Sequence, residues 1–194
     1  MEFSTYYSRQ LEEHLSACAS LDTKSLQAIL ATLLNCFRSG GKVLLCGNGG
    51  SAALCQHLAA EFVVRFRSVR HPLPAIALTT DTSCLTAGAN DFGFDSVFAR
   101  QVEALGQPAD VLITCSTSGE STNVLAAAKE AATKELTTIG LCGTPGSSLA
   151  SICDHVLEVE SNETARVQEV HLFAAHTLCG YIEASLDSPW NERC

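Results

Sequence analysis

Short, continuous apolar runs recur along the chain. KVLLC at 42–46 and DVLIT at 110–114 have apolar interiors without polar alternation, which is typical of strands covered on both faces. The last run, HVLEV, is the weakest. Together the runs predict five strands, at 42–46, 74–78, 110–114, 136–142 and 155–159.

Stretches with apolar residues at helical spacing lie between and around these runs. Because continuous apolar strands alternate with helices, the pattern predicts an α/β fold whose parallel sheet is covered by helices on both faces, a three-layer αβα sandwich. The expected helices span 3–20, 23–38, 51–66, 94–105, 121–133 and 163–186.

The organisation is that of a single domain. The chain has 194 residues, 46% of them hydrophobic and 17% charged, which suits one domain with a sizeable core and excludes a disordered chain. We expect an N-terminal helical pair at 1–38, a core at 39–186, and a short tail at 187–194 to which the sequence gives no interpretation.

The N-terminal helical pair carries more apolar surface than its own domain needs. A parallel sheet is already covered by its own helices, so this surface predicts contact with another copy of the chain. The alternative is that the pair packs only on its own domain. The leucines concerned are Leu11, Leu15, Leu21, Leu26, Leu30, Leu33 and Leu34.

The net charge and the cysteine pattern limit the binding partners and the cellular location that we expect. The formal net charge of -9 argues against non-specific binding of nucleic acid. No apolar run is long enough for a membrane helix, and the first residues show no secretory signal. None of the 10 cysteines is spaced C-x-x-C, so we expect reduced, mostly buried thiols in a cytoplasmic protein.

Two of the strands end in loops suited to a phosphate group. The first strand runs into Gly47, Asn48, Gly49, Gly50 and Ser51, where glycines allow a tight turn and a close backbone approach. The third runs into the loop 115–121, and a helix follows each loop, so free N–H groups point outward. The hydroxyls of the second loop are Ser116, Thr117, Ser118 and Ser121.

The alternative is that these residues only cap helices. Capping requires one hydroxyl or two, whereas the second loop has four. Neither loop contains G-K-[ST] or G-x-G-x-x-G, the main sequence signals for binding a nucleoside triphosphate or a dinucleotide. The loops therefore do not indicate either of these ligands. Loops on the first and third strands fit the flavodoxin-like strand order 2-1-3-4-5, with a ligand crevice between them.

Four polar residues are candidates for chemistry. His57 and Glu61 are spaced i, i+4 and share a helix face. Gln168 and His176 lie eight residues apart on the last helix, so they differ by about 80° in direction and can meet only beside it. His171 points more nearly opposite His176. Taken singly, each is better explained as a surface or helix-pairing polar group.

Four segments carry a family resemblance. CGNGGSAALCQHLAAEF, ANDFGF, CSTSGES and RVQEVHLFAAH resemble the corresponding segments of the phosphoheptose isomerases, which have the SIS (sugar isomerase) fold. The resemblance spans roughly residues 1–186 in order and spacing. It implies interconversion of D-sedoheptulose 7-phosphate and D-glycero-D-manno-heptose 7-phosphate, the first step of nucleotide-activated heptose biosynthesis.

The resemblance also implies residue roles. Glu61 and His176 match the family's catalytic acid/base pair, and one zinc ion per subunit would be held by His57, Glu61, Gln168 and His176. It further implies a homotetramer with active sites near subunit interfaces. The implied substrate-binding residues are Asn48, Gly49, Gly50, Ser51, Glu61, Asn90, Asp91, Ser116, Thr117, Ser118, Ser121 and Gln168.

Two positions depart from the family pattern. Glu120 stands where many members have Asn, and Ala165 stands where some have Asp; both bear on rate and substrate preference. Two other functions stay open: a non-catalytic phosphosugar-binding or replication-initiator-binding module, and isomerisation of another phosphosugar. A binding module needs the phosphate loop but has no need of Glu61 together with His176.

The expected chemistry moves a proton between C1 and C2 through an enediol(ate). Glu61 would shuttle the carbon-bound proton, and His176 would move the proton between oxygens or assist ring opening. A zinc ion would polarise the carbonyl. Metal and base functions at one residue compete, because a zinc-bound carboxylate is a weaker base, so the sequence leaves open whether zinc is catalytic or organisational.

Overall fold

The computed structural model describes residues 1–143 and 145–186; the predicted tail at 187–194 lies outside the described residues. The strands are β1 (Val43–Gly47), β2 (Ala75–Ala77), β3 (Val111–Ser116), β4 (Thr137–Cys142) and β5 (His155–Glu158). The helices are α1 (Phe3–Ala19), α2 (Thr23–Arg38), α3 (Gly49–Val63), α4 (Thr82–Phe92), a 3-10 turn η1 (Phe94–Ser96), α5 (Val97–Leu105), α6 (Thr122–Thr133) and α7 (Thr164–Ser185).

The five strands form one parallel sheet in the order β2-β1-β3-β4-β5, which confirms the predicted order. The two central strands are aligned so that Gly47 at the end of β1 pairs with Cys115 near the end of β3. Because parallel strands end at the same edge, the loops that follow β1 and β3 are neighbours there.

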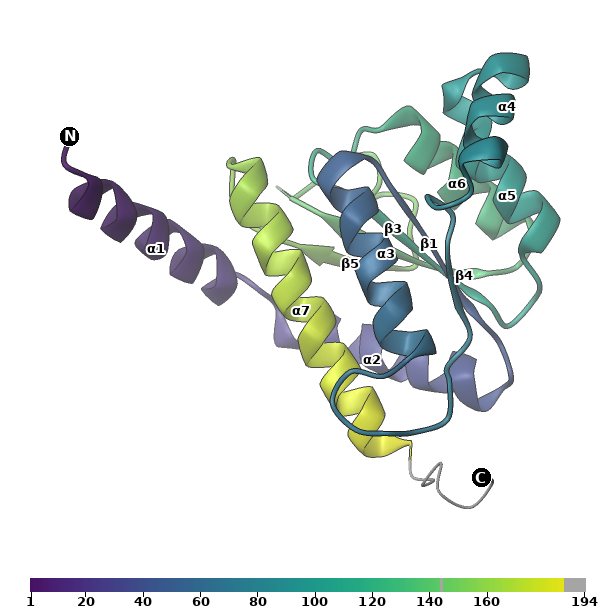
Figure 1. The fold of residues 1–194 in the computed structure, drawn as a ribbon, viewed down its shortest axis with the longest axis horizontal. Coiled ribbons are helices and arrows are strands. Elements are labelled where there is room, and N and C mark those ends of the chain that lie inside the picture. The colour runs from purple at the N-terminus through teal and green to yellow at the C-terminus, as the bar shows by residue number, and fades with distance from the viewer. Residues whose placement is uncertain (144, 187–194) are drawn as a thin grey trace.

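Two apolar clusters cover the two faces of the sheet. The larger joins α2, α3 and α7 to one face, with Leu33, Leu58 and Leu178 among its buried members. The other joins α5 and α6 to the opposite face through residues such as Val102 and Ala127. Figure 1 shows these layers, with α3 and α7 side by side in front of the sheet, and they confirm the three-layer sandwich.

Helix α2 belongs to the core layer, whereas α1 stands apart from it. Leu33 is buried, and Leu26, Leu30 and Leu34 pack on the main cluster, so α2 covers its own sheet. Figure 1 shows α1 projecting away from the sheet. The surplus apolar surface predicted for both helices is therefore largely a property of α1, where Leu11 and Leu15 are exposed.

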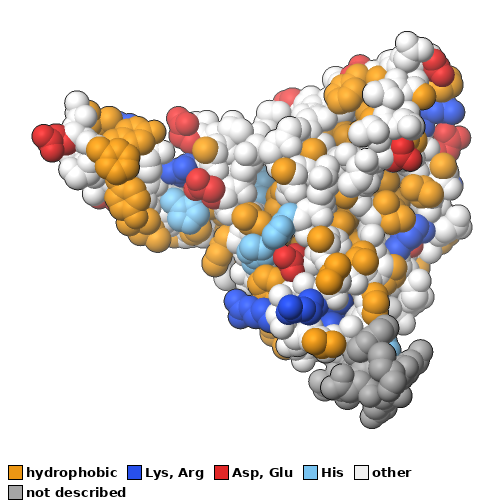
Figure 2. Space-filling model, in the orientation of Figure 1, with side chains coloured by type: hydrophobic (Ala, Val, Ile, Leu, Met, Phe, Trp, Pro, Cys, Tyr) orange, Lys and Arg blue, Asp and Glu red, His pale blue; other side chains and the backbone are white. Residues whose placement is uncertain are grey.

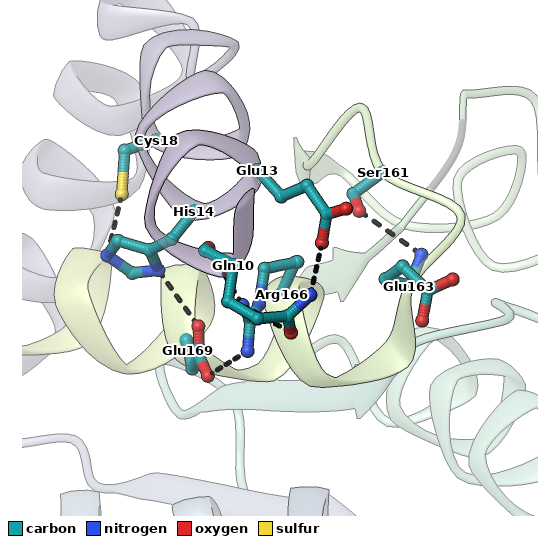
Figure 3. A network of polar contacts seen from close by, with 8 residues as sticks. All are labelled: Gln10, Glu13, His14, Cys18, Ser161, Glu163, Arg166 and Glu169. Atoms are coloured by element: carbon teal, nitrogen blue, oxygen red, sulfur yellow. Dashed lines mark hydrogen bonds and ion pairs between the residues drawn. The ribbon is translucent and has the colours of Figure 1, made fainter. Parts of the chain in front are cut away.

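A polar network fixes α1 to the first turns of α7. The buried Arg166 donates to the backbone oxygen of Gln10 at 2.9 Å and to Glu169 at 2.6 Å. Glu169 contacts His14 at 2.9 Å, and His14 in turn contacts Cys18. Figure 3 shows these side chains converging from the two helices, so α1 has a defined direction although little of it is covered.

The main departure from expectation is α4, which the hydrophobic pattern did not indicate. This helix has no buried residue and so leaves no apolar stripe in the sequence. Its N-terminus is capped by the side chain of Asp81, which accepts from the backbone N–H of Cys84 at 2.9 Å. Among the described residues, no helix is long and apolar enough to cross a membrane.

Candidate active site

The two predicted phosphate loops meet at the carboxyl edge of the sheet. The backbone at Gly47 passes so close to β3 that a Cβ there would lie 2.9 Å from the carbonyl oxygen of Cys115. Gly49 has φ +54°, in the left-handed region that favours glycine. These glycines therefore bring the start of α3 down beside the loop that follows β3.

Hydroxyl groups gather in the loop after β3. Ser116 Oγ lies 3.0 Å from Ser121 Oγ and 3.5 Å from Ser118 Oγ. The turn between them has Gly119 at φ +68°, and the backbone N–H groups of Gly119 and Glu120 point at Ser116 Oγ and Ser118 Oγ, at 3.1 and 3.2 Å. The loop thus forms a compact cup of donors.

Helix capping does not account for this loop. Ser121 occupies the N-cap position of α6, yet its side chain makes no capping hydrogen bond and faces Ser116 instead. The first N–H groups of α6 are therefore left for a ligand. The loop also borders a pocket whose other walls are Ser161, Asn162, Thr164 and Val167, at the start of α7. Sequence reasoning did not single out this second wall.

A pair of amides joins the two loops. Asn48 Nδ2 donates to Asn123 Oδ1 at 2.8 Å, and Asn123 Nδ2 donates back to Asn48 Oδ1 at 2.9 Å. Asn123 is buried on the first turn of α6. Asn123 was not predictable from the sequence, because a single Asn inside a helical stretch carries no signal. The pair fixes the direction in which the Asn48 amide points.

Three of the four chemical candidates converge within a single chain. His57 Nε2 lies 2.8 Å from His176 Nε2 and 3.3 Å from Glu61 Oε1. The two imidazole rings meet edge to face, with centroids 5.1 Å apart. Glu61 and His176 are partly buried while His57 is exposed. These residues meet because α3 and α7 pack face to face. Positions on either helix alone would not bring them together.

Gln168 lies beside this group. It lines a groove together with His57, Gly50 and Leu172. A Cβ on Gly50 would stand 2.5 Å from Gln168 Oε1, so the glycine makes room for this amide. Ser51, also expected at the site, is buried on the same turn of α3. The groove runs from the Gly-rich loop to His57.

The donor set suits a divalent metal ion. The ligand atoms of His57, Glu61 and His176 all lie within 4.8 Å of one another, and they form the one such group among the described residues. Two imidazoles and one carboxylate are a set that zinc uses in catalytic sites, where a further position stays open. The exposure of His57 provides that opening.

His171 is not part of the site. It is fully buried on the opposite side of α7 and its Nε2 lies 3.1 Å from the carbonyl oxygen of Cys142. Burial lowers the pKa of His171 to about 4, despite the hydrogen bond to that carbonyl. The expectation that it points away from His176 is confirmed.

Asn90 and Asp91 occupy the last turn of α4, exposed, and Asn90 Nδ2 donates to Asp91 Oδ1 at 2.7 Å. Within the described residues, no hydrogen bond joins either to the loops after β1 and β3.

The carboxylate of Glu120 turns away from the hydroxyl cup and accepts hydrogen bonds from the backbone N–H and the hydroxyl of Ser148, at 2.8 and 2.6 Å. These bonds lower the pKa of Glu120. The carboxylate is thus held in its charged form by Ser148.

The site opens on one face of the molecule. Figure 2 shows histidine side chains with an acidic one beside them near the middle of this face, over α3 and α7. Basic side chains lie just below, and Arg65 and Arg67 are exposed on the segment after α3. A negatively charged substrate would therefore meet positive charge near the histidines although the whole chain is acidic.

Comparison with known proteins places this geometry in a family. The SIS domain profile matches residues 6–143. A phosphoheptose isomerase of Roseiflexus sp. is 56% identical over 159 residues, covering 82% of this chain and 81% of that protein. One from Paramagnetospirillum magneticum is 46% identical and covers 95% of this chain and 97% of that protein.

A solved structure agrees. The phosphoheptose isomerase of Neisseria gonorrhoeae superposes with a TM-score of 0.88 at 39% identity, covering 94% of this chain and all of that one.

Proposed function

We propose that this chain, which belongs to the SIS domain family and within it to the phosphoheptose isomerases, interconverts D-sedoheptulose 7-phosphate and D-glycero-D-manno-heptose 7-phosphate. It is an aldose–ketose isomerase. The observation that carries the proposal is the convergence of Glu61 and His176, a carboxylate and an imidazole, in a chain that also has a phosphate-type loop after β3. A module that only binds a phosphosugar has no use for that pair.

The substrate phosphate binds in the hydroxyl cup. Ser116, Thr117, Ser118 and Ser121 donate to its oxygens together with the first N–H groups of α6. Asn48, held by Asn123, and the backbone of Gly49 and Gly50 contact the sugar chain on its way to α3. Gln168 lines that path. Asn90 and Asp91 reach the substrate from α4, which requires movement or a neighbouring subunit.

The proton transfers fall to two residues. Glu61 takes the carbon-bound proton at one of C1 and C2 and returns it at the other, and its partial burial favours a carboxylate that exchanges protons with substrate rather than water. His176 carries the proton between the two oxygens. The contact of His57 with both residues holds them on the same side of the substrate.

We further propose that His57, Glu61 and His176 hold one zinc ion per subunit, with Gln168 as a fourth donor from the adjoining groove. A bound metal ion would polarise the substrate carbonyl and stabilise negative charge on its oxygen. The three facing donor atoms support this part of the proposal. A homotetramer and a cytoplasmic location complete it, supported by the exposed apolar face of α1 and the resemblance to the family.

The test is to incubate the purified protein with sedoheptulose 7-phosphate and follow aldose formation by NMR, with and without a chelator. Conversion at catalytic rates supports the proposal. Arabinose 5-phosphate serves as the comparison substrate. Faster turnover of that sugar would assign a different isomerase, and binding of both sugars without turnover would assign a binding module.

A further inference from the structure

An aromatic ring from the segment after α3 packs flat against the imidazole of His176. The rings of Phe66 and His176 are stacked, with centroids 5.2 Å apart and planes 26° from parallel. His57 meets the same imidazole from a different direction, at its Nε2 edge. The orientation of His176 is thus set by Phe66 on a face and His57 at an edge.

The ring of Phe66 also packs on α7 one turn beyond His176. Gly180 lies one turn after His176, and a Cβ at this position would stand 3.4 Å from Phe66 Cε1. The guanidinium group of Arg67 also lies over the Phe66 ring, with its Cζ 4.9 Å from the ring centroid. Phe66 is itself partly buried against the main apolar cluster. The ring is therefore fixed by contacts on several sides.

The backbone that carries Phe66 is held by one buried carboxylate. Glu183 accepts hydrogen bonds from three successive N–H groups, those of Phe66 at 3.0 Å and of Arg67 and Ser68 at 2.8 Å each. Glu183 follows His176 by seven residues, two turns along the same side of α7. A single helix face thus carries both the imidazole and the anchor of the ring that packs on it.

Arg70 extends the anchor to α3. Its Nε lies 3.4 Å from Glu183 Oε1, and both side chains are buried. Its Nη2 donates to the backbone oxygen of Glu61 at 2.6 Å and its Nη1 to that of Phe62 at 2.8 Å. These carbonyls belong to the last turn of α3, whose acceptors lack helical partners. Arg70 and Glu183 therefore connect the turn that carries Glu61 to the helix that carries His176.

We propose that Phe66 is a positioning residue for His176, and that Glu183 and Arg70 act through Phe66 by holding its segment against α7. The inference rests on the proposed catalytic role of His176. A loose Phe66 would leave the imidazole free to turn away from the substrate oxygens. Such misplacement acts on the chemical step and leaves the phosphate contacts at the other end of the substrate intact.

The first experiment compares Phe66→Leu, Phe66→Tyr and the control Val69→Ala. Val69 is an exposed apolar residue of the same segment. We expect Phe66→Leu to lower kcat by about tenfold to a hundredfold with KM nearly unchanged. Phe66→Tyr, which keeps the aromatic ring, should retain most of the wild-type kcat, and Val69→Ala should leave kcat unchanged. A normal kcat in Phe66→Leu, or a loss that Phe66→Tyr fails to rescue, overturns the proposal.

A second measurement separates this inference from the enzymatic assignment. In protein with 13C-labelled histidine, the ring signals of His176 should move when Phe66 becomes Leu, because the ring current of Phe66 is removed. They should stay near their wild-type positions in Phe66→Tyr. This readout needs no turnover, so a wild-type protein without isomerase activity would sink the proposed function alone. Unchanged His176 signals in Phe66→Leu would sink the positioning role alone.

The route through Glu183 is tested by combining variants. If Glu183 acts through Phe66, the double variant Phe66→Leu/Glu183→Gln loses no more kcat than the more affected single variant. Losses that multiply show separate actions and refute the route. Thermal unfolding of each variant is recorded first; should Glu183→Gln fail to fold, Arg70→Lys replaces it in the same cycle.

Discussion

His57 Nε2 and His176 Nε2 face each other at 2.8 Å across the α3–α7 contact. Nitrogen atoms at this distance either share one proton or surround a positive ion, since two lone pairs repel. Glu61 stands 3.3 Å from the same His57 nitrogen and adds negative charge. The group is thus arranged to receive a cation.

Zinc is therefore expected to bind at one equivalent per chain. Adding zinc to metal-free protein should raise its unfolding temperature, because a ligand that binds only the folded state stabilises it. His57→Ala should abolish that rise, whereas His155→Ala, on β5 and in contact with Thr32, should retain it. Metal content after dialysis, measured by mass spectrometry, provides the stoichiometry. Equal zinc binding by His57→Ala would refute the site.

Glu61→Gln should remove turnover while substrate binding stays nearly intact. The amide keeps the shape of the side chain and cannot accept the carbon-bound proton, so kcat should fall by at least about a hundredfold. Aldose formation by NMR measures the rate, and calorimetric titration measures binding. Glu103→Gln, which alters an exposed carboxylate far from α3, is the control. Near-normal turnover in Glu61→Gln would sink the assignment.

Ser118→Ala should weaken substrate binding more than it slows the chemical step. Ser118 Oγ belongs to the hydroxyl cup, 3.5 Å from Ser116 Oγ, where we propose that the substrate phosphate binds. Loss of a hydrogen bond to a charged group raises KM by about tenfold or more. Thr133→Ala, which removes an exposed hydroxyl at the far end of α6, is the control. A large loss of kcat at saturating substrate with KM unchanged would count against this role.

The sheet was predictable from the sequence because its central strands β1, β3 and β4 are buried on both faces and leave continuous apolar runs. KVLLC and DVLIT located the two loops that follow β1 and β3, and loops on these strands fit the strand order 2-1-3-4-5. The hydroxyl-rich composition of the second loop pointed to Ser116 and Ser121. The convergence of His57 with His176 was not predictable from spacing, because it depends on how two helices 119 residues apart pack. The roles of these residues came from family resemblance.

The residues that sequence reasoning missed share a physical cause. Asn123, Arg70 and Glu183 are buried polar groups whose partners lie far along the chain or on another helix. Their hydrogen bonds satisfy each other in three dimensions, and a single sequence records no trace of such pairing. The exposed helix α4 was missed for the opposite reason, since it buries nothing.

The assembly prediction centres on α1. Phe3, Tyr7, Leu11 and Leu15 recur every four residues on it and are 45–80% exposed in a single chain. Figure 2 shows this apolar surface on the projecting helix. Light scattering should give four times the 20.5 kDa monomer mass. Leu15→Glu should dissociate the assembly and reduce activity, whereas Ser16→Glu, off the stripe, should do neither. A fully active monomer would refute the prediction.

The last prediction concerns acid stability and His171. The pKa of this buried imidazole is lowered to about 4 from 6.5, chiefly by burial. Above pH 6.5 the residue is neutral in both states and carries no penalty. As the pH falls from 6.5 to 4, the unfolded chain binds a proton that the folded chain excludes, so the free energy of unfolding should drop by about 3 kcal/mol from this residue.

His171→Gln should remove this dependence. The amide can still donate to the carbonyl oxygen of Cys142 and does not titrate, so the variant loses stability at pH 7.5 but shows a flatter slope below pH 6.5. Val170→Ala, which removes buried packing on the same helix, should be destabilised with the wild-type slope. Urea unfolding at a series of pH values measures both. Parallel pH profiles for His171→Gln and the wild type would show that His171 takes up its proton in the folded protein as readily as in the unfolded chain.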